Sequence, residues 1–169
     1  NDEIRGDVFD LLLSNVRTPE ERCGDLESQI STNRIGKQRL IETSEKYGMT
    51  EVSDYMDQLQ EYSARIMRQS LRHLPDGSYS FSDFLDDDGI DNHPIELRVK
   101  ITIDGTEAII DFTGSANQVK GSMNATYAIT VSAVFYVFQC LANINIPSNS
   151  GCLDPIEIIA PIGSIVNAQ

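Results

Sequence analysis

The spacing of apolar residues changes near Pro75, and this change divides the chain into two predicted parts. Before Pro75, apolar residues recur every three or four positions, as in amphipathic helices. The pattern predicts a long helix over residues 19–47 and a second over residues 50–74, which we expect to pack antiparallel to each other. The apolar run at residues 7–17 is also near helical spacing, although so short a run is compatible with a strand.

Local signals mark both ends of the longer helix. Thr18 precedes Pro19 and is followed three residues later by Glu21, which is the sequence of a capping box with proline in the first turn. Gly48 is placed to end the helix in a left-handed conformation. Polar residues interrupt the apolar side of this helix, so its spacing indicates neither a plain core face nor a plain solvent face.

Beyond the helices the apolar residues alternate, which is typical of strands. The LPDGSY stretch at residues 74–79 has the composition of a turn, and the alternation over residues 95–103 then predicts a half-buried strand. Asp104-Gly105 predicts a two-residue hairpin turn, with residues 107–112 as the antiparallel partner strand.

The most apolar stretch, residues 125–144, is long enough to raise the question of a membrane span. Polar side chains such as Gln139 interrupt it and no basic residue follows it closely, so a buried core helix packed on the sheet is the better interpretation. Cys140 within it is then a small buried apolar residue. The tail over residues 152–169 predicts one or two further strands.

These elements predict an α+β fold. We expect a helical subdomain over residues 1–74, followed by an α+β subdomain over residues 75–169 in which a mostly antiparallel sheet packs on a buried apolar helix.

Composition narrows the classes of function. The 26 acidic residues against 13 basic ones give a formal net charge of −13, which opposes binding to nucleic acid. The three widely spaced cysteines form neither a metal-binding pattern nor a disulfide framework, which fits a reducing, cytoplasmic compartment. No signal-peptide pattern begins the chain, and we expect an internal piece of a longer protein.

Two stretches have candidate chemistry. The acidic stretch LDDDGIDNHPIE, residues 85–96, suggests a cation site, but Phe84 and Ile95 would occupy the first and last positions of a calcium loop, so turn capping is favoured. In residues 111–124 a strand ends in a loop of small residues before a helix expected to begin near Asn124. Such a loop can bind an anion or a carbonyl oxygen, or it can be an ordinary turn with Asn124 as the N-cap.

The order of four motifs resembles the hydantoinase B/oxoprolinase family. The motifs are RTPEERCGDLESQISTNRIGKQRL, KYG, LPDGSYSFSDFLDDDG and IIDFTGSANQVKGSMN, and the NSGC stretch at residues 149–152 resembles the family's Asn-x-Gly loop. The resemblance implies part of an ATP-dependent cyclic-amide hydrolase of the N-methylhydantoinase or 5-oxoprolinase type. It also leaves open a component of an acetone or acetophenone carboxylase, or a non-catalytic assembly module.

The resemblance further implies partners, cofactors and a site. An A-type subunit or domain would use ATP in a hetero-oligomer that acts on a small cyclic amide. ATP and a divalent metal belong to the complete enzyme, whereas this piece is expected to bind no cofactor, to hold no metal ligand and to be inactive alone. The candidate substrate-binding residues are Asp111, Ser115, Gln118, Asn124, Arg22 and Asp25.

Overall fold

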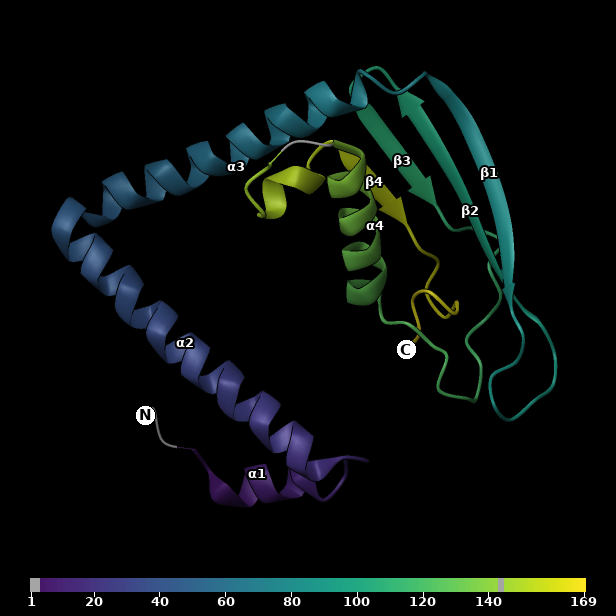
Figure 1. Cartoon of the computed structure of the whole chain (residues 1–169), viewed down its shortest axis with the longest axis horizontal. Coiled ribbons are helices and arrows are strands. Elements are labelled where there is room, and N and C mark those ends of the chain that lie inside the picture. The colour runs from purple at the N-terminus through teal and green to yellow at the C-terminus, as the bar shows by residue number, and fades with distance from the viewer. Residues whose placement is uncertain (1–3, 143–144) are drawn as a thin grey trace. The chain divides into compact units, whose positions relative to one another are not determined.

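The computed structural model describes residues 4–142 and 145–169 and has the predicted α+β fold (Figure 1). Its helices are α1 (Gly6–Leu13), α2 (Pro19–Tyr47), α3 (Met49–Leu71), α4 (Tyr127–Ala142) and the short 3-10 helix η1 (Ser150–Leu153). Its strands are β1 (Gly77–Leu85), β2 (Ile95–Asp104), β3 (Glu107–Asp111) and β4 (Ile156–Ile159).

The chain forms two compact units, Asn1–Tyr55 and Met56–Gln169, which divide within α3. This division falls within α3 because the second half of the helix supplies core residues to the second unit. The expected domain boundary after residue 74 stays a prediction. Met67 and Leu71 are buried there in one cluster with residues of the sheet and of α4.

The first unit has helices with almost no core of their own. The run that was ambiguous between helix and strand is helical, as α1. Of residues 4–55, only Val52 is buried, so the expected packing of two helices does not form a core there. The apolar residues of α2 are too scattered among polar ones to make a continuous stripe.

The ends of α2 agree only in part with the sequence signals. Gly48 follows the helix with a φ of 89°, and its N–H donates to the Ser44 carbonyl oxygen over 2.8 Å. Thr18 makes no side-chain capping bond to the described residues, so the predicted capping box is wrong. Its carbonyl oxygen instead accepts from the Arg22 N–H at 3.0 Å, which begins the helical ladder.

The second unit is built on a mixed sheet with strand order β1-β2-β3-β4 (Figure 1). The first three strands are antiparallel and β4 is parallel to β3. The predicted hairpin between β2 and β3 forms, but its two turn residues are Gly105 and Thr106, one position later than expected, because Asp104 pairs with Glu107 as the last residue of β2. Gly105 has a positive φ of 58°. β1 was not predicted as a strand. Its alternation of serine with aromatic residues was hidden behind the turn composition at its start.

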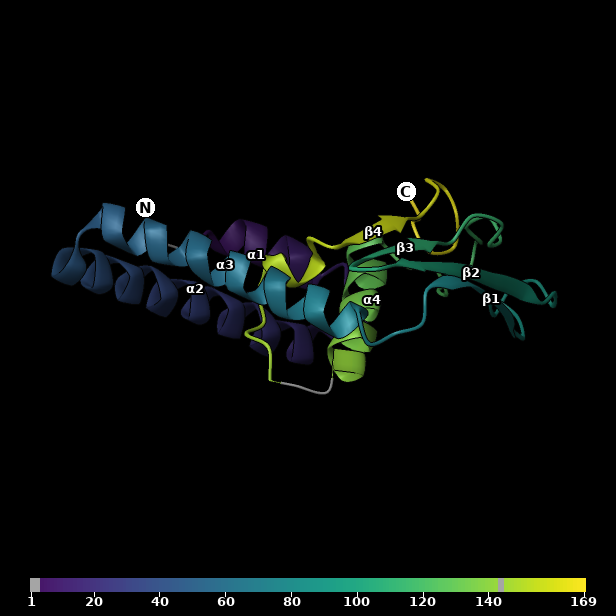
Figure 2. The same ribbon diagram turned by 90° about the horizontal axis from the view of Figure 1, so that it is seen from above.

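The helix α4 covers one side of the sheet (Figures 1 and 2) and buries only one of its own faces. Val134 and Phe138 pack into the main cluster, and the buried Thr130 hydroxyl donates to the Val166 carbonyl oxygen over 2.6 Å. The opposite face is open, because the sheet reaches only one side of the helix. Tyr136 is 69% exposed, so the predicted core helix packs on the sheet with one face only. Cys140 is exposed, and its predicted burial is wrong.

Positions 143–144, at the end of the predicted apolar run, lie outside the described residues. None of the described helices is long and apolar enough to cross a bilayer.

Candidate functional site

Two loops of the second unit are joined by one carboxylate, that of Asp88. Its Oδ1 accepts hydrogen bonds from the N–H groups of Asp91 at 2.7 Å and Ile90 at 2.9 Å, within the loop between β1 and β2. Its Oδ2 accepts from the Gly121 N–H at 3.0 Å, in the loop between β3 and α4. These bonds, the one from Asp91 first, hold the pKa of Asp88 below its usual value. The acidic stretch therefore caps its own turn, as the sequence favoured.

The contact between the loops requires glycine at position 121. A Cβ atom added there would lie 1.8 Å from the Asp88 carbonyl oxygen, far inside van der Waals contact. The two loops therefore approach each other closely, backbone to backbone, which a side chain at this position would prevent.

Asn124 closes the second loop on itself. Its Oδ1 accepts from the Val119 N–H at 2.8 Å, and its Nδ2 donates to the carbonyl oxygens of Val119 at 2.7 Å and Gly121 at 3.1 Å. The expected role as N-cap of the following helix is wrong, because α4 begins only at Tyr127 and the Asn124 amide is engaged within the loop.

A cleft of about 310 Å³ lies between these two loops. This volume is at the lower end of the range for small-ligand sites. The cleft is lined by Asp88, Asp91, His93, Pro94, Ile95, Ala116, Gln118, Val119 and Lys120. Among the residues predicted for substrate binding, only Gln118 lines this cleft. His93 and Lys120 were not predicted, since nothing in the sequence shows that residues 27 positions apart share one cavity.

The other predicted side chains of this loop hold its backbone in place. The Asp111 carboxylate accepts from the Thr113 N–H at 2.8 Å. Hydrogen bonds from the Thr113 side chain and N–H, with the charge of Lys100, hold the pKa of Asp111 below its usual value. The Ser115 hydroxyl donates to the Arg98 carbonyl oxygen at 2.9 Å and accepts from the Arg98 N–H at 3.0 Å.

The polar groups of Gln118 are also engaged. Its N–H donates to the Gly163 carbonyl oxygen, and its Oε1 accepts from the Gln169 N–H, both at 2.8 Å. Its side-chain NH₂ group has no hydrogen-bond partner among the described residues. Gln118 therefore combines a fixed carbonyl group with a position on the cleft wall.

Arg22 and Asp25 lie on α2, in the first unit. They form an ion pair of 2.8 Å and are both about half exposed. That they bind the substrate stays a prediction.

The NSGC stretch fastens η1 to α3 within the second unit. The Asn149 side chain accepts from the Gly151 N–H at 3.0 Å and donates to the Ser63 hydroxyl at 2.9 Å. The buried Cys152 thiol donates to the Pro147 carbonyl oxygen at 3.4 Å. A Cβ atom at Gly151 would lie 2.1 Å from the Gln60 carbonyl oxygen, so glycine is required here too. These contacts indicate a structural role.

The described ranges, 4–142 and 145–169, contain no group of three His, Cys, Asp or Glu side chains placed to hold a metal ion. The residues of the cleft do not fit the divalent metal implied for the complete enzyme, and we assign it no ligand among them.

The whole chain, residues 1–169, matches the Hydantoinase B/oxoprolinase family. The chain belongs to this family. It is 38% identical over 171 residues to the B-type subunit of a putative D-/L-hydantoinase of Pseudomonas sp. (strain NS671), covering 95% of this chain and 29% of that protein. It is 34% identical over 169 residues to 5-oxoprolinase 1 of Arabidopsis thaliana, covering 92% of this chain and 13% of that protein.

Solved structures have the same fold. The crystal structure of the ATP-dependent caprolactamase from Pseudomonas jessenii superposes with a TM-score of 0.82 at 31% identity, over 99% of this chain and 29% of that one. The nucleotide-free structure of acetone carboxylase also gives a TM-score of 0.82, but at 17% identity, over 99% of this chain and 24% of that one, which shows the fold alone. This family member therefore spans less than a third of the length of each of these relatives.

Proposed function

We propose that the chain is part of an ATP-dependent cyclic-amide hydrolase of the N-methylhydantoinase or 5-oxoprolinase type. The observation that carries this proposal is the similarity to the B-type hydantoinase protein of Pseudomonas sp., at 38% identity over 95% of the chain. The ATP-dependent caprolactamase, at 31% identity, supports the same class. A carboxylase is the alternative, but its structural relative is only 17% identical.

The proposed enzyme acts with an A-type subunit or domain that uses ATP. Two relatives, the B-type hydantoinase protein and the beta subunit of caprolactamase, are by name parts of larger assemblies, which supports a hetero-oligomer of this kind. Phosphorylation of the amide oxygen would convert it into a leaving group and lower the barrier to opening a resonance-stabilised ring. This chain has no phosphate-binding GK[ST] motif, so we propose that the nucleotide binds the A-type partner.

The 111–124 loop is proposed to line the reaction cavity at the cleft beside Asp88. Gln118 would donate its side-chain NH₂ to a substrate carbonyl, and Lys120 would favour negative charge there. Asp111, Ser115 and Asn124 would act by holding the backbone of this loop in position, since their side chains are engaged within the chain.

Arg22 and Asp25 remain proposed contributors to substrate binding. Their ion pair would have to open, or act as a unit, for either side chain to contact a substrate. The pair is exposed and solvent-screened, so opening it costs about 0–1 kcal/mol.

The test uses the full-length protein assembled with its A-type partner. We expect ATP hydrolysis coupled to the opening of a cyclic amide, with hydantoins, 5-oxoproline and caprolactam as probes. Bicarbonate fixation that depends on acetone, without amide opening, would instead establish a carboxylase. An intact complex with neither activity would indicate an assembly module.

The cavity assignment has its own test. We expect Gln118→Ala to lower kcat/KM by about tenfold, or roughly 1.4 kcal/mol, without changing the unfolding midpoint. Asp111→Asn should lower the midpoint together with activity, because Asp111 positions the loop. A rate within about twofold for Gln118→Ala would remove Gln118 from the proposed site.

A further inference from the structure

The outer edge of β1 has no strand partner among the described residues. The sheet order puts β1 at one end of the sheet, where it pairs with β2 along its other edge (Figure 1). β1 is nine residues long, GSYSFSDFL, and contains neither lysine nor proline. Native proteins commonly protect exposed edges with such residues, with bulges or with covering segments. The charged Asp83 lies near the end of β1, so residues 77–82 form an unprotected edge that is a ready site for another strand.

Hydrogen bonds on the far side of β2 show which groups of β1 face outward. The N–H and carbonyl groups of Arg98 both bond to the Ser115 hydroxyl, at 3.0 and 2.9 Å. Arg98 is the register partner of Ser82 in β1. Because the backbone groups of Arg98 point away from β1, this is a non-hydrogen-bonded pair of the antiparallel ladder. The backbone groups of Ser82 therefore point to the open edge.

The pair two residues further along β1 has the same orientation. Phe84 pairs with Glu96, whose carbonyl oxygen accepts from the Ala116 N–H at 2.8 Å, away from β1. The Phe84 N–H donates to the Asp83 carboxylate at 2.9 Å. Since a strand alternates with a period of two, the N–H and carbonyl groups of Ser80 face outward as well.

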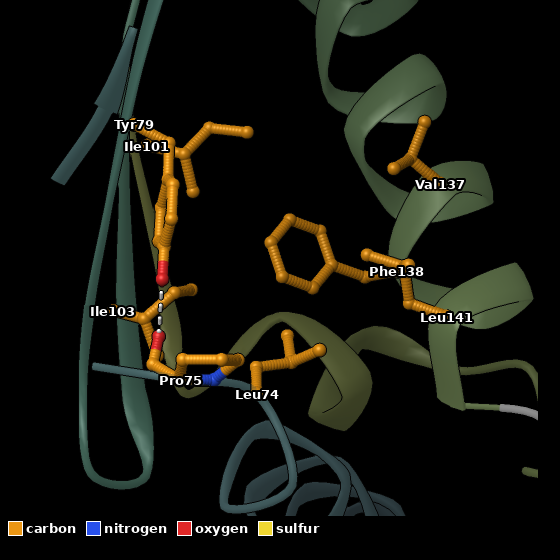
Figure 3. Close-up of a pocket in the computed structure, with 8 residues that line it drawn as sticks. All are labelled: Leu74, Pro75, Tyr79, Ile101, Ile103, Val137, Phe138 and Leu141. Carbon is orange, nitrogen blue, oxygen red and sulfur yellow. Dashed lines mark hydrogen bonds between the residues drawn. The ribbon is translucent and has the colours of Figure 1, made fainter. Parts of the chain in front are cut away.

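An apolar pocket of about 280 Å³ opens beside this edge (Figure 3). It is lined by Leu74, Pro75, Tyr79, Ile101, Ile103, Val137, Phe138 and Leu141. The Tyr79 hydroxyl donates to the Pro75 carbonyl oxygen over 2.9 Å, which fixes the ring as one wall (Figure 3). Phe81, two residues along β1, lies on the same face of the sheet and is 67% exposed. Unpaired backbone and uncovered apolar side chains thus adjoin one another.

We propose that a strand from the part of the full-length polypeptide outside residues 1–169 pairs with β1 and places a large apolar side chain in this pocket. The chain covers 29% of the B-type hydantoinase protein of Pseudomonas sp., so most of such a protein lies outside these residues. A segment of the same molecule is present at an effective concentration of about millimolar. A second copy is disfavoured, because each carries a formal net charge of −13. This inference rests on family membership and is independent of the reaction catalysed.

Photo-crosslinking in the full-length protein tests the occupant. With Phe81→p-benzoylphenylalanine, we expect an intramolecular crosslink to an apolar peptide outside residues 1–169, identified by mass spectrometry after digestion. Phe84→p-benzoylphenylalanine is the matched control, since Phe84 lies on the opposite face of the same strand. It should give a lower yield with that peptide. A crosslink from position 81 to a second copy or to an A-type partner, equal yields from both positions, or no crosslink would overturn the proposal.

Hydrogen exchange of the unsubstituted full-length protein is the second measurement. The Ser80 and Ser82 amides should exchange at least about tenfold more slowly than in an unstructured peptide, because the added strand accepts their hydrogen bonds. Exchange at the unstructured rate would show that the edge remains open and would overturn the strand pairing.

Discussion

The two compact units differ in what holds their elements in place. Of the described residues in the first unit, 4–55, only Val52 is buried, and α2 is a long helix with local end signals. In the second unit, the sheet, α4 and the end of α3 share a continuous core. A helix needs only local hydrogen bonds to form, whereas each strand requires a partner distant in sequence. The first unit is thus specified locally and the second by tertiary contacts.

Core substitutions should show the largest difference between the units. Phe138 is 3% exposed in the main cluster, so Phe138→Ala should reduce the free energy of unfolding by about 3–5 kcal/mol. Ile35 on α2 is 63% exposed, and Ile35→Ala should change it by less than about 0.5 kcal/mol. Urea unfolding of the full-length protein measures both. Equal losses would show that α2 is as firmly packed as the sheet, and the comparison would fail.

Replacement of a glycine by alanine should change the stability of the protein in opposite directions in the two units. Gly121→Ala forces a Cβ atom against the Asp88 backbone and should destabilise the protein by about 1–3 kcal/mol. A Cβ atom at Gly36 in α2 would meet no other atom within 4 Å. Gly36→Ala should therefore stabilise the protein by about 0.4–1 kcal/mol, because alanine favours the helix and restricts the unfolded chain. The thermal unfolding midpoint of each variant should fall for Gly121→Ala and rise for Gly36→Ala. Stabilisation by Gly121→Ala would disprove the close approach of the two loops.

Acidification should weaken the junction of the loops in the second unit. The folded pKa of Asp88 is lowered, so its contribution to stability is fully present above the unfolded value of about 3.9 and is lost as the pH falls through the folded value. Asp88→Asn should therefore reduce stability near neutral pH and flatten its fall at acidic pH. Urea midpoints across roughly pH 3–6 test this. An unchanged acid dependence in the variant would contradict the role of the carboxylate.

The smallest effect is expected from the ion pair on α2. Arg22 and Asp25 are exposed and three residues apart, so their coupling free energy should be about 0–1 kcal/mol. A double-mutant cycle of Arg22→Ala and Asp25→Ala, followed by unfolding, measures it. A coupling above about 2 kcal/mol would indicate that the pair is buried in the full-length protein, and the first unit would then resemble the second.

Local patterns were sufficient for much of the fold. The proline at the start of α2 and Gly48 at its end act within a few residues, and each is found where the sequence indicates. The hairpin after β2 is also found, with its turn shifted by one residue to Gly105 and Thr106. The family could also be identified from ordered motifs. β1 was missed because its alternation of serine with aromatic residues follows directly on the turn composition, and its residues are mostly exposed rather than buried on one face.

Some features of the candidate site could likewise be found from the sequence, whereas others depend on the tertiary structure. The 111–124 loop could be chosen as a candidate from the sequence, since small residues follow a strand there, and Gln118 belongs to the family motif in it; their role in binding stays a prediction. The cleft itself was not, because it depends on the hydrogen bond between Asp88 and Gly121, which are 33 positions apart. Asn124 was a candidate for substrate binding or, in the alternative, for a helix cap, but the closed loop takes up its amide.

The sequence alone determined the helices with clear ends, the hairpin, the α+β class and the family, because these depend on short-range geometry or on motif order. Only the tertiary structure decided which face of α4 is buried, that β4 lies parallel to β3, and that His93 and Lys120 line a cleft with Gln118. The physical reason is that burial and long-range pairing depend on which surfaces meet after the chain has folded. Residue type and spacing along the chain do not determine that.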